Sequence, residues 1–348
     1  MIKIPLHRLE LALKFAKKYK DCRLKQIAHN VVIGNQEDDN LLVFPCYTQG
    51  NEIEINLDNN LKKIVAFFKQ QKIDNIDIDD NGISVNNIHI NINMTTKLSA
   101  HYLDIYKSTY SSSNDDFELI YIYDQIYKIF DFANFASNDP ARLSINGVFI
   151  SSNGELAATN GKRLITNQKV LVNRSPHGSI IIPLSTIKHL KTIFKERGFF
   201  FYKHKTIKDL YKFSNDVFTL YTTKQDGTYP DYKRCFPTKK QEIYICNGND
   251  LYEAVVQSYK RDVFDCCYID IEFCGTLGKI KVAADYGFSR KIDLCQMSDR
   301  TDRVVKINPL YLDFLKGKSC VKIKVIDHLQ PIIVEDNENK YVIMPMRG

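Results

Sequence analysis

Few residues of this chain have the types and spacing that catalysis requires. Gly154 and Gly161 precede Lys162, as in the outline of a phosphate-binding loop, but the glycine spacing is wrong. Arg163 also stands where Ser or Thr would have to hold magnesium. The chain contains neither a G-x-S-x-G nor an H-E-x-x-H motif, and its eight histidines are isolated. We therefore expect no catalytic residue and a protein that is not an enzyme; a nuclease or hydrolase is the enzymatic alternative.

Metal binding has equally little support. The segment Asp77–Gly82 begins like a calcium loop, but Ile88 takes the place of the bidentate glutamate, which favours a hairpin turn. The nine cysteines are scattered, and Cys266, Cys267 and Cys274 lack histidine partners. We expect no metal and no cofactor, and reduced thiols in a cytoplasmic protein.

The composition is that of an ordinary globular protein with a basic excess. A length of 348 residues predicts two to three domains. No apolar run approaches the ~20 residues of a membrane-spanning helix, and the first residues lack a signal-peptide core, so we expect no membrane partner. The net charge of +7 fits a polyanionic partner such as DNA, although a solvated basic face is an equally good interpretation.

Two turns and the carboxy-terminal run are the most distinctive features. Asn160-Gly161 favours positive φ and a sharp turn, and Lys162 and Arg163 follow it. Tyr229–Tyr232 is a second turn, in which proline fixes φ. Tyr341–Gly348 is a β-prone run with two methionines around a proline, and methionine is typical of adaptable apolar grooves. Together they predict a cleft that accepts apolar side chains from a partner; a plain edge strand is the alternative for the last run.

These three segments resemble the bacterial β sliding clamp, the β subunit of DNA polymerase III and its processivity factor. That family carries an ATDGHRL turn, a G-x-(Y/F)-P-D-Y-(R/K)-R turn and a terminal Y-V-(V/I)-M-P-M-R run. The corresponding segments here are Ala158–Leu164, Gly227–Arg234 and Tyr341–Arg347, in the same order and at about the same spacing. The match is specific over the second and third thirds of the chain and weak over the first.

The resemblance implies a pocket for a partner peptide, with the charges of Arg163 and Arg347 at its rim. Lys162 departs from the family's usual histidine, Cys235 stands in a usually aliphatic place, and Gly348 stands where some members have leucine. The implied pocket residues are Ile145, Thr159, Gly161, Lys162, Arg163, Leu164, Pro230, Arg234, Cys235, Pro331, Val342, Met344, Pro345, Met346 and Arg347.

The resemblance also implies that helices carrying basic residues face bound DNA. Arg23 follows the first helix, where the family often has a DNA-contacting arginine. Lysines of this kind hold phosphates without reading the base sequence. The implied DNA-binding residues are Arg23, Lys17, Lys18, Lys20, Lys62, Lys63, Lys128, Lys188, Lys191, Lys195 and Lys260.

The hydrophobic pattern predicts a repeated unit. Amphipathic helices are expected at 6–19, 123–136 and 250–259, and a second set at 59–70, 185–196 and 309–315, with Ser185 as an N-cap and Pro309 in a first turn. Alternating strand signals follow, at 73–78, 83–92, 198–202, 217–222, 321–325 and 331–334. Recurrence at roughly 120 residues predicts three similar α+β domains, each with two helices packed on antiparallel sheets. We expect boundaries at 1–113, 114–240 and 241–348.

The family resemblance implies the assembly and its partners. Two copies would form a head-to-tail homodimeric ring around duplex DNA, independent of base sequence. The ring would tether the replicative DNA polymerase and other proteins with clamp-binding motifs, and a clamp-loader ATPase would place it on DNA. The alternatives are a divergent clamp paralogue, from a mobile element or specialised in repair, and a DNA-binding scaffold that does not encircle.

Overall fold

The structure is a computed structural model of the chain. It describes residues 2–17, 19, 22–27, 29–34, 40–46, 53–79, 82–85, 88–91, 116–121, 128–167, 178–194, 198–207, 209–225, 227–258, 268–284, 287–298 and 300–346. The chain divides into two units, one formed by Met1–Phe130 with Ile182–Gln225 and the other by Asp131–Ile181 with Asp226–Gly348.

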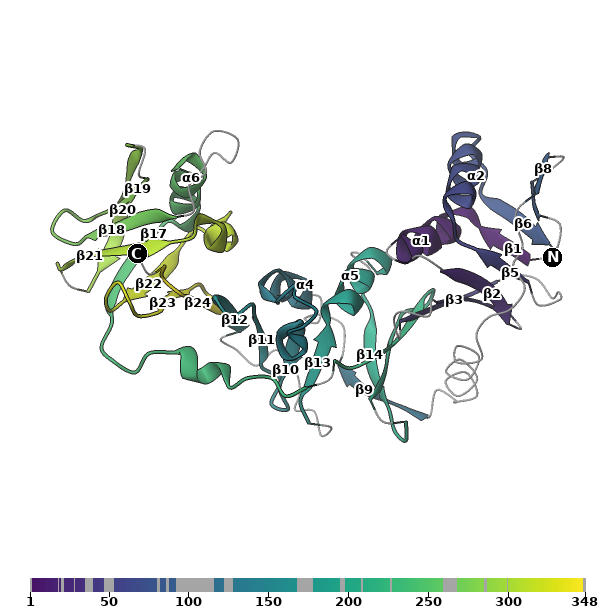
Figure 1. Cartoon of the computed structure of the whole chain (residues 1–348), viewed down its shortest axis with the longest axis horizontal. Helices are drawn as coiled ribbons and strands as arrows, with labels where there is room; N and C mark the ends of the chain where they lie inside the picture. Colours follow the sequence, from purple (N-terminus) through teal and green to yellow (C-terminus); the bar gives the residue numbers. More distant parts are fainter. Residues whose placement is uncertain are drawn as a thin grey trace. The chain divides into compact units, whose positions relative to one another are not determined.

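The described residues of the first unit form two antiparallel sheets and helices that pack beside them, as Figure 1 shows. Its helices are α1 (Leu6–Ala16), α2 (Asn59–Gln70) and α5 (Leu184–Ile193). One sheet has the order β1 (Ile2–Pro5), β6 (Asn75–Asp79), β7 (Gly82–Val85) and β8 (Ile88–Asn91). The other has the order β5 (Glu54–Asn56), β2 (Arg23–Ile27), β3 (Asn30–Gly34), β4 (Leu41–Pro45), β16 (Thr219–Thr223), β15 (Leu210–Ser214), β14 (Phe200–His204) and β9 (Phe117–Tyr121).

The second unit is built on a twelve-stranded sheet. The strand order is β13 (Ile180–Pro183), β10 (Gly147–Ile150), β11 (Leu156–Thr159), β12 (Arg163–Asn167), β24 (Asn339–Ile343), β23 (Ile332–Glu335), β22 (Val321–Val325), β17 (Glu242–Cys246), β20 (Ser289–Met297), β19 (Lys279–Ala283), β18 (Ile269–Cys274) and β21 (Asp302–Ile307). Its helical segments are the end of α4 (Ile129–Phe132), α6 (Gly248–Ser258) and the 3-10 helices η3 (Ala133–Phe135), η4 (Leu143–Ile145), η5 (Tyr232–Cys235) and η6 (Pro309–Leu315).

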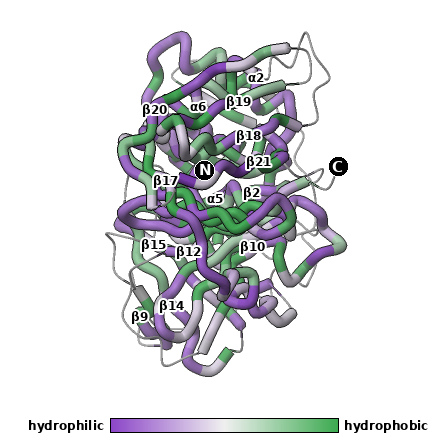
Figure 2. Tube along the Cα trace, turned by 90° about the vertical axis from the view of Figure 1, so that its left-hand side faces the viewer, coloured by the Kyte–Doolittle hydropathy of each residue, from purple (hydrophilic) through white to green (hydrophobic). Residues whose placement is uncertain are grey.

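Helices and strands each bury one face. In α1 the buried residues are Leu6, Leu9, Ala12, Phe15 and Ala16, a spacing that follows one side of a helix. The hydropathy colouring of Figure 2 shows hydrophobic stretches interrupted by hydrophilic ones along the elements. The α2 bounds agree with the expected helix at 59–70, and the Asp58 side chain caps it by accepting from the backbone N–H groups of Asn60 and Leu61.

The helix at 185–196 begins one residue earlier than expected. α5 starts at Leu184, directly after Pro183, and no side chain caps it. Ser185 therefore lies inside the first turn, and its expected role as an N-cap is wrong. Proline at the preceding position fixes φ near the helical value and supplies the entry to the helix.

The expected strand at 321–325 is β22, with the same bounds, and other elements differ in length or type. Residues 309–315 form a 3-10 helix in which Pro309 does occupy the first turn, and Asn308 accepts from the N–H of Leu310. The expected strand at 83–92 is two strands, β7 and β8. Of the expected helix at 123–136, residues 122–127 lie outside the described residues, and α4 continues into η3.

The element order repeats three times. A strand, a helix, four strands, a second helix and three strands occur as β1 to β8, as β9 to β16 and as β17 to β24, with η6 as the second helix of the last copy. Neighbouring copies share sheets, because β4 pairs with β16 and β12 pairs with β24. The middle copy therefore contributes strands to both units.

Candidate functional site

The turn between β11 and β12 is held by its own side chains. Gly161 has φ +86°, and a Cβ at this position would lie 2.8 Å from Nη2 of Arg142. The Thr159 hydroxyl accepts from the N–H of Gly161 at 3.0 Å and donates to the carbonyl of Arg163 at 2.7 Å. Asn160 Oδ1 accepts from the N–H groups of Lys162 and Arg163 at 2.9 and 3.0 Å. The Asn-Gly pair thus forms the sharp turn that the sequence predicts.

A second segment, around Tyr232, lies against this turn. Tyr229 stacks on Phe149 with ring centroids 4.6 Å apart, and the Tyr232 hydroxyl donates to Glu155 at 3.0 Å. Asp231 accepts from Nε of Arg234 at 3.0 Å, which closes the turn after Pro230. These contacts fix the segment to β10 and to the residue before β11.

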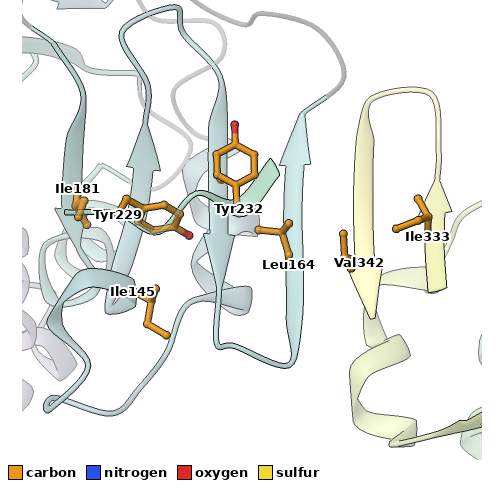
Figure 3. Packing of buried hydrophobic residues seen from close by; sticks show 8 residues of the cluster. Ile145, Leu164, Ile181, Tyr229, Tyr232, Ile333 and Val342 are labelled. Carbon is orange, nitrogen blue, oxygen red and sulfur yellow. The ribbon is translucent and has the colours of Figure 1, made fainter. Parts of the chain in front are cut away.

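The base of the site is a buried apolar cluster. Ile145, Leu164, Tyr232 and Val342 pack together with Ala157, Ile181, Tyr229 and Ile333. Figure 3 shows Leu164 on β12 and Val342 on β24, which are directly paired residues of adjacent strands. The second and third copies of the repeat therefore share this floor.

The carboxy-terminal segment continues the pairing beyond β24. The N–H of Met344 donates to the carbonyl of Lys162 at 2.9 Å, and the Met344 side chain is exposed. Two residues later the N–H of Met346 donates to the carbonyl of Lys306 at 2.8 Å. The two methionines are thus attached to different strands, β12 and β21.

A cleft of about 450 Å³ opens above this floor. Of the residues expected in a pocket, it is lined by Ile145, Thr159, Gly161, Lys162, Arg163, Leu164, Pro230, Cys235, Val342 and Met344. Arg234 is exposed and bound to Asp231, and Pro331 and Pro345 are half-buried; these three are not among the lining residues. Met346 lines a separate cleft beside Lys306 and Arg303. Arg347 lies outside the described residues.

Sequence reasoning missed four lining residues, Arg142, Ser144, Asp231 and Tyr232. The last two lie inside the turn motif that contains Pro230, so the motif itself was a usable signal. Arg142 donates to the carbonyl of Asn160 across the mouth of the turn at 3.1 Å. No local pattern marks it, because its partner lies eighteen residues further along the chain.

The tyrosine hydroxyls and the cysteine thiol at this cleft stay protonated at neutral pH, because the pKa of each is raised. Burial raises the pKa of Tyr232 to about 12, with the Glu155 carboxylate acting in the same direction. Burial also raises the pKa of the Tyr229 hydroxyl and, with Asp231, that of the Cys235 thiol. The cleft therefore offers apolar and neutral surface with basic side chains at its edge. Such a site, which Asp231, Arg142 and Lys162 also line, can bind an apolar peptide.

The expected DNA-binding residues lie mostly on the helices of the first unit. Lys17 follows α1, Lys62 and Lys63 lie on α2, and Lys188 and Lys191 lie on α5; all five are exposed. Lys128 precedes α4 and is half-buried. Arg23 lies in β2 and donates to Glu54 at 3.0 Å, so this guanidinium is held on its own sheet. Lys18, Lys20, Lys195 and Lys260 lie outside the described residues.

A groove of about 990 Å³ runs between α1 and α2. Lys14, Lys17 and Lys62 line it, together with the ion pair that Lys69 forms with Glu10 at 2.8 Å. Asp58, the remaining acidic residue there, is engaged in capping α2. The groove is therefore positively charged, as a surface that contacts phosphates must be.

The described residues form neither a metal site nor a membrane-spanning helix. Among them no three His, Cys, Asp or Glu side chains converge as metal ligands. Within the same part of the chain, no helix has the length and hydrophobicity to cross a membrane.

Solved structures identify the architecture. The DNA polymerase III subunit β of Pseudomonas aeruginosa matches with a TM-score of 0.75 at 16% identity, over 100% of both chains. The chain has the sliding-clamp fold. The Bacillus subtilis DNA polymerase sliding clamp matches with a TM-score of 0.77 at 15% identity, over 100% of this chain and 99% of that one. The Helicobacter pylori β clamp, bound to a DNA ligase peptide, matches with a TM-score of 0.75 at 16% identity, over 99% of each chain.

Searches by sequence add no relative to these sliding clamps. No protein-family model and no curated protein matches the chain. The clamp fold is therefore retained here with most side chains replaced.

Proposed function

We propose that this protein is a DNA sliding clamp, a closed ring of two copies that encircles duplex DNA. The observation that carries the proposal is the similarity to solved sliding clamps along the entire chain. The ring acts by topology, because a closed ring cannot leave DNA sideways, and weak phosphate contacts then suffice. It makes and breaks no bond, and it works in the cytoplasm, where bacterial DNA lies.

Unused strand edges support the ring. The fourth strand of the second copy, β12, pairs with the last strand of the third, β24, and β4 pairs with β16 in the same way. The fourth strand of the third copy is β20, and the last strand of the first copy is β8. These two strands stand at the equivalent positions and do not pair with each other within the chain. β8 is at the edge of its sheet, and no described strand pairs with the free side of Ser289–Asp293 in β20. Pairing β8 of one copy with β20 of the next closes a head-to-tail homodimer.

The repeat also supports three clamp domains, with the proposed boundaries 1–113, 114–240 and 241–348. The second and third copies begin with β9 at Phe117 and β17 at Glu242. Each proposed boundary thus lies a few residues before the first strand of a new copy. The DNA contact is assigned to the exposed lysines of α1, α2 and α5, which carry no base-reading geometry.

The cleft between β12 and β24 is assigned to protein partners. Its apolar floor and basic edge suit a short peptide with leucine or phenylalanine side chains. We propose that the replicative DNA polymerase, the clamp-loader ATPase and other proteins with clamp-binding motifs dock there. All of them would compete for one site on each copy.

The decisive test compares circular with linear DNA. The protein, placed on a nicked circle by its clamp loader, should survive a wash in high salt. Cutting the circle should then release it, because the ring slides off the ends. Lysine contacts alone would be lost from both forms at the same salt concentration. Equal loss from circle and linear DNA would contradict encirclement and favour a scaffold that only binds DNA.

A further inference from the structure

Arg163 makes an unusual set of contacts for a residue expected at the rim of a cleft. Its Nη2 donates to the carbonyl of Asn134 at 2.7 Å, in η3 of the second copy of the repeat. Its Nη1 donates to the carbonyl of Leu310 at 3.2 Å, in η6 of the third copy. One side chain on β12 therefore ties together elements that are 29 and 147 residues away in sequence.

Two aromatic rings complete the environment. The guanidinium carbon lies 4.7 Å from the ring centroid of Phe135 and 5.7 Å from that of Tyr311. Burial lowers the pKa of Arg163 below its ordinary value, against the opposing effect of the Asp313 carboxylate. A planar guanidinium can donate in two fixed directions and stack at the same time, and an ammonium cannot.

Arg163 also lies beside the cleft, at the joint between the second and third copies of the repeat. Arg163 pairs with Ile343 in the ladder between β12 and β24, and Leu164 beside it belongs to the apolar floor. The preceding carbonyl, of Lys162, accepts from the N–H of Met344. The cleft wall from the second copy and the cleft wall from the third therefore meet at Arg163.

We propose that Arg163 is a positioning residue that couples the cleft to the joint between the second and third copies of the repeat. It holds η6 and β24 against β12, and it thereby sets the spacing between Leu164 and Met344. A peptide in the cleft, in turn, steadies η6 through the same side chain. This inference rests on the proposed function as a peptide-binding clamp, and it replaces the expectation that Arg163 supplies a charge at the pocket rim.

Three variants separate geometry from charge. Arg163→Lys keeps the positive charge and loses the planar guanidinium that donates in two fixed directions. Arg163→Met loses both the charge and this geometry. Lys162→Met is the matched control, because it removes an exposed charge from the same turn and leaves the joint contacts in place. The probe is a synthetic peptide rich in leucine and phenylalanine, titrated by fluorescence at two salt concentrations.

Both Arg163 variants should weaken the peptide by roughly tenfold, the effect of one lost anchoring contact, without changing its salt dependence. Lys162→Met should weaken the peptide only through the lost charge, so that its effect shrinks at the higher salt concentration, as expected of a charge at the cleft edge. Wild-type affinity in Arg163→Lys together with a loss in Arg163→Met would show that Arg163 acts through its charge, and would overturn the proposal.

Amide hydrogen exchange in Leu310–Leu315 measures the coupling directly. In the wild-type protein the peptide should slow exchange there, and in Arg163→Met that effect should disappear. Without peptide, Arg163→Met should exchange faster in η6 than Lys162→Met. Unaltered η6 exchange in the peptide-free variant would overturn the proposal whether or not peptide binds. Faster η6 exchange in a protein that binds no peptide would support the role in the joint and count against the proposed function.

Discussion

The two joints between copies of the repeat are both formed by antiparallel strand pairing, and different side chains surround the paired strands in each. In the first joint, β4 and β16 pair through Val43–Thr219, Leu42–Leu220 and Leu41–Tyr221. In the second, β12 and β24 pair through five successive residues, from Arg163–Ile343 to Asn167–Asn339. The second ladder is the longer of the two.

The shorter ladder is supported by buried polar groups and by helix packing. The Thr186 hydroxyl donates to Asn40 Oδ1 at 3.0 Å and also bonds the Thr222 hydroxyl at 2.8 Å. Tyr19, just after α1, bonds His189 of α5 at 2.5 Å, and Phe15 lies 4.3 Å from the same imidazole ring. Side chains of the first joint therefore contact one another around the paired strands.

The longer ladder leaves room for a ligand. Its helical side is closed by Arg163 and by the Phe314 ring, which stacks on Tyr341 at 3.9 Å. On its other side lies the cleft floored by Leu164 and Val342. Side chains secure both joints, and the difference is that those beside the second ladder, Arg163, Leu164 and Val342, also line a cleft.

Removal of the carboxy-terminal segment should have the largest effect. Deleting Met344–Gly348 removes the Met344 wall of the cleft and its bond to Lys162. We expect peptide binding to be abolished while the homodimer persists, since the proposed ring contact uses β8 and β20. Calorimetric titration and light scattering measure the two properties. Unchanged affinity in a folded, dimeric truncation would contradict the assignment of the cleft.

Leu164→Ala should come next. Leu164 is buried in the shared floor, so the change leaves a void under the cleft. We expect the peptide to bind more weakly by about 1–3 kcal/mol, the effect of losing an anchoring contact. Leu277→Ala, at an exposed position in the turn between β18 and β19, is the control and should leave affinity unchanged. Equal effects of both changes on peptide titration would argue against a specific floor.

Thr186→Val tests the first joint. The variant keeps the shape and leaves Asn40 and Thr222 without their shared hydroxyl in a buried place, which costs about 1–3 kcal/mol of unfolding free energy. Urea unfolding measures the loss, and peptide affinity should stay at the wild-type value. Thr192→Val, which removes only a bond to the Lys188 carbonyl on α5, is the control. A parallel loss of peptide affinity would mean that the two joints are not independent.

The smallest expected effect is a pH dependence at the cleft wall. Burial acts to raise the pKa of Glu155, but hydrogen bonds from Lys233 and Tyr232 outweigh it and lower the pKa below its ordinary 4.5. The stabilisation is therefore complete above pH 4.5 and is lost as the pH falls below it. Stability measured against pH should show this loss in the wild type and not in Glu155→Gln. If both proteins lost the same stability at acidic pH, the hydrogen bonds of the Glu155 carboxylate would contribute nothing to stability.

The parts of the site that the sequence predicts are those formed by local chemistry. The turn at Asn160-Gly161 needs only its own residues, so its sequence predicted the turn, while its place in a pocket was implied by the family resemblance. The helix at 59–70 is equally local, with Asp58 as its cap. The three-copy repeat followed from hydrophobic periodicity for the same reason.

The parts that escaped prediction depend on distant contacts. Arg163 was assigned to a rim, but its partners Asn134 and Leu310 are brought to it only by the fold. Met346 was placed with Met344 because both lie in the terminal run that resembles the family motif, yet its N–H bonds the Lys306 carbonyl of β21 and it lines another cleft. Neither fact leaves a local pattern that could be read from the chain.

The ladders that join the copies have a consequence for how this protein can change over evolutionary time. Their bonds run between backbone N–H and C=O groups, which every residue except proline supplies in full. The pairing between copies therefore does not itself dictate the side chains along the ladders, so long as the alternation of buried and exposed positions survives. Sequence drift that keeps this alternation keeps the ladders. What such drift cannot tolerate is a proline in the middle of β12 or β16.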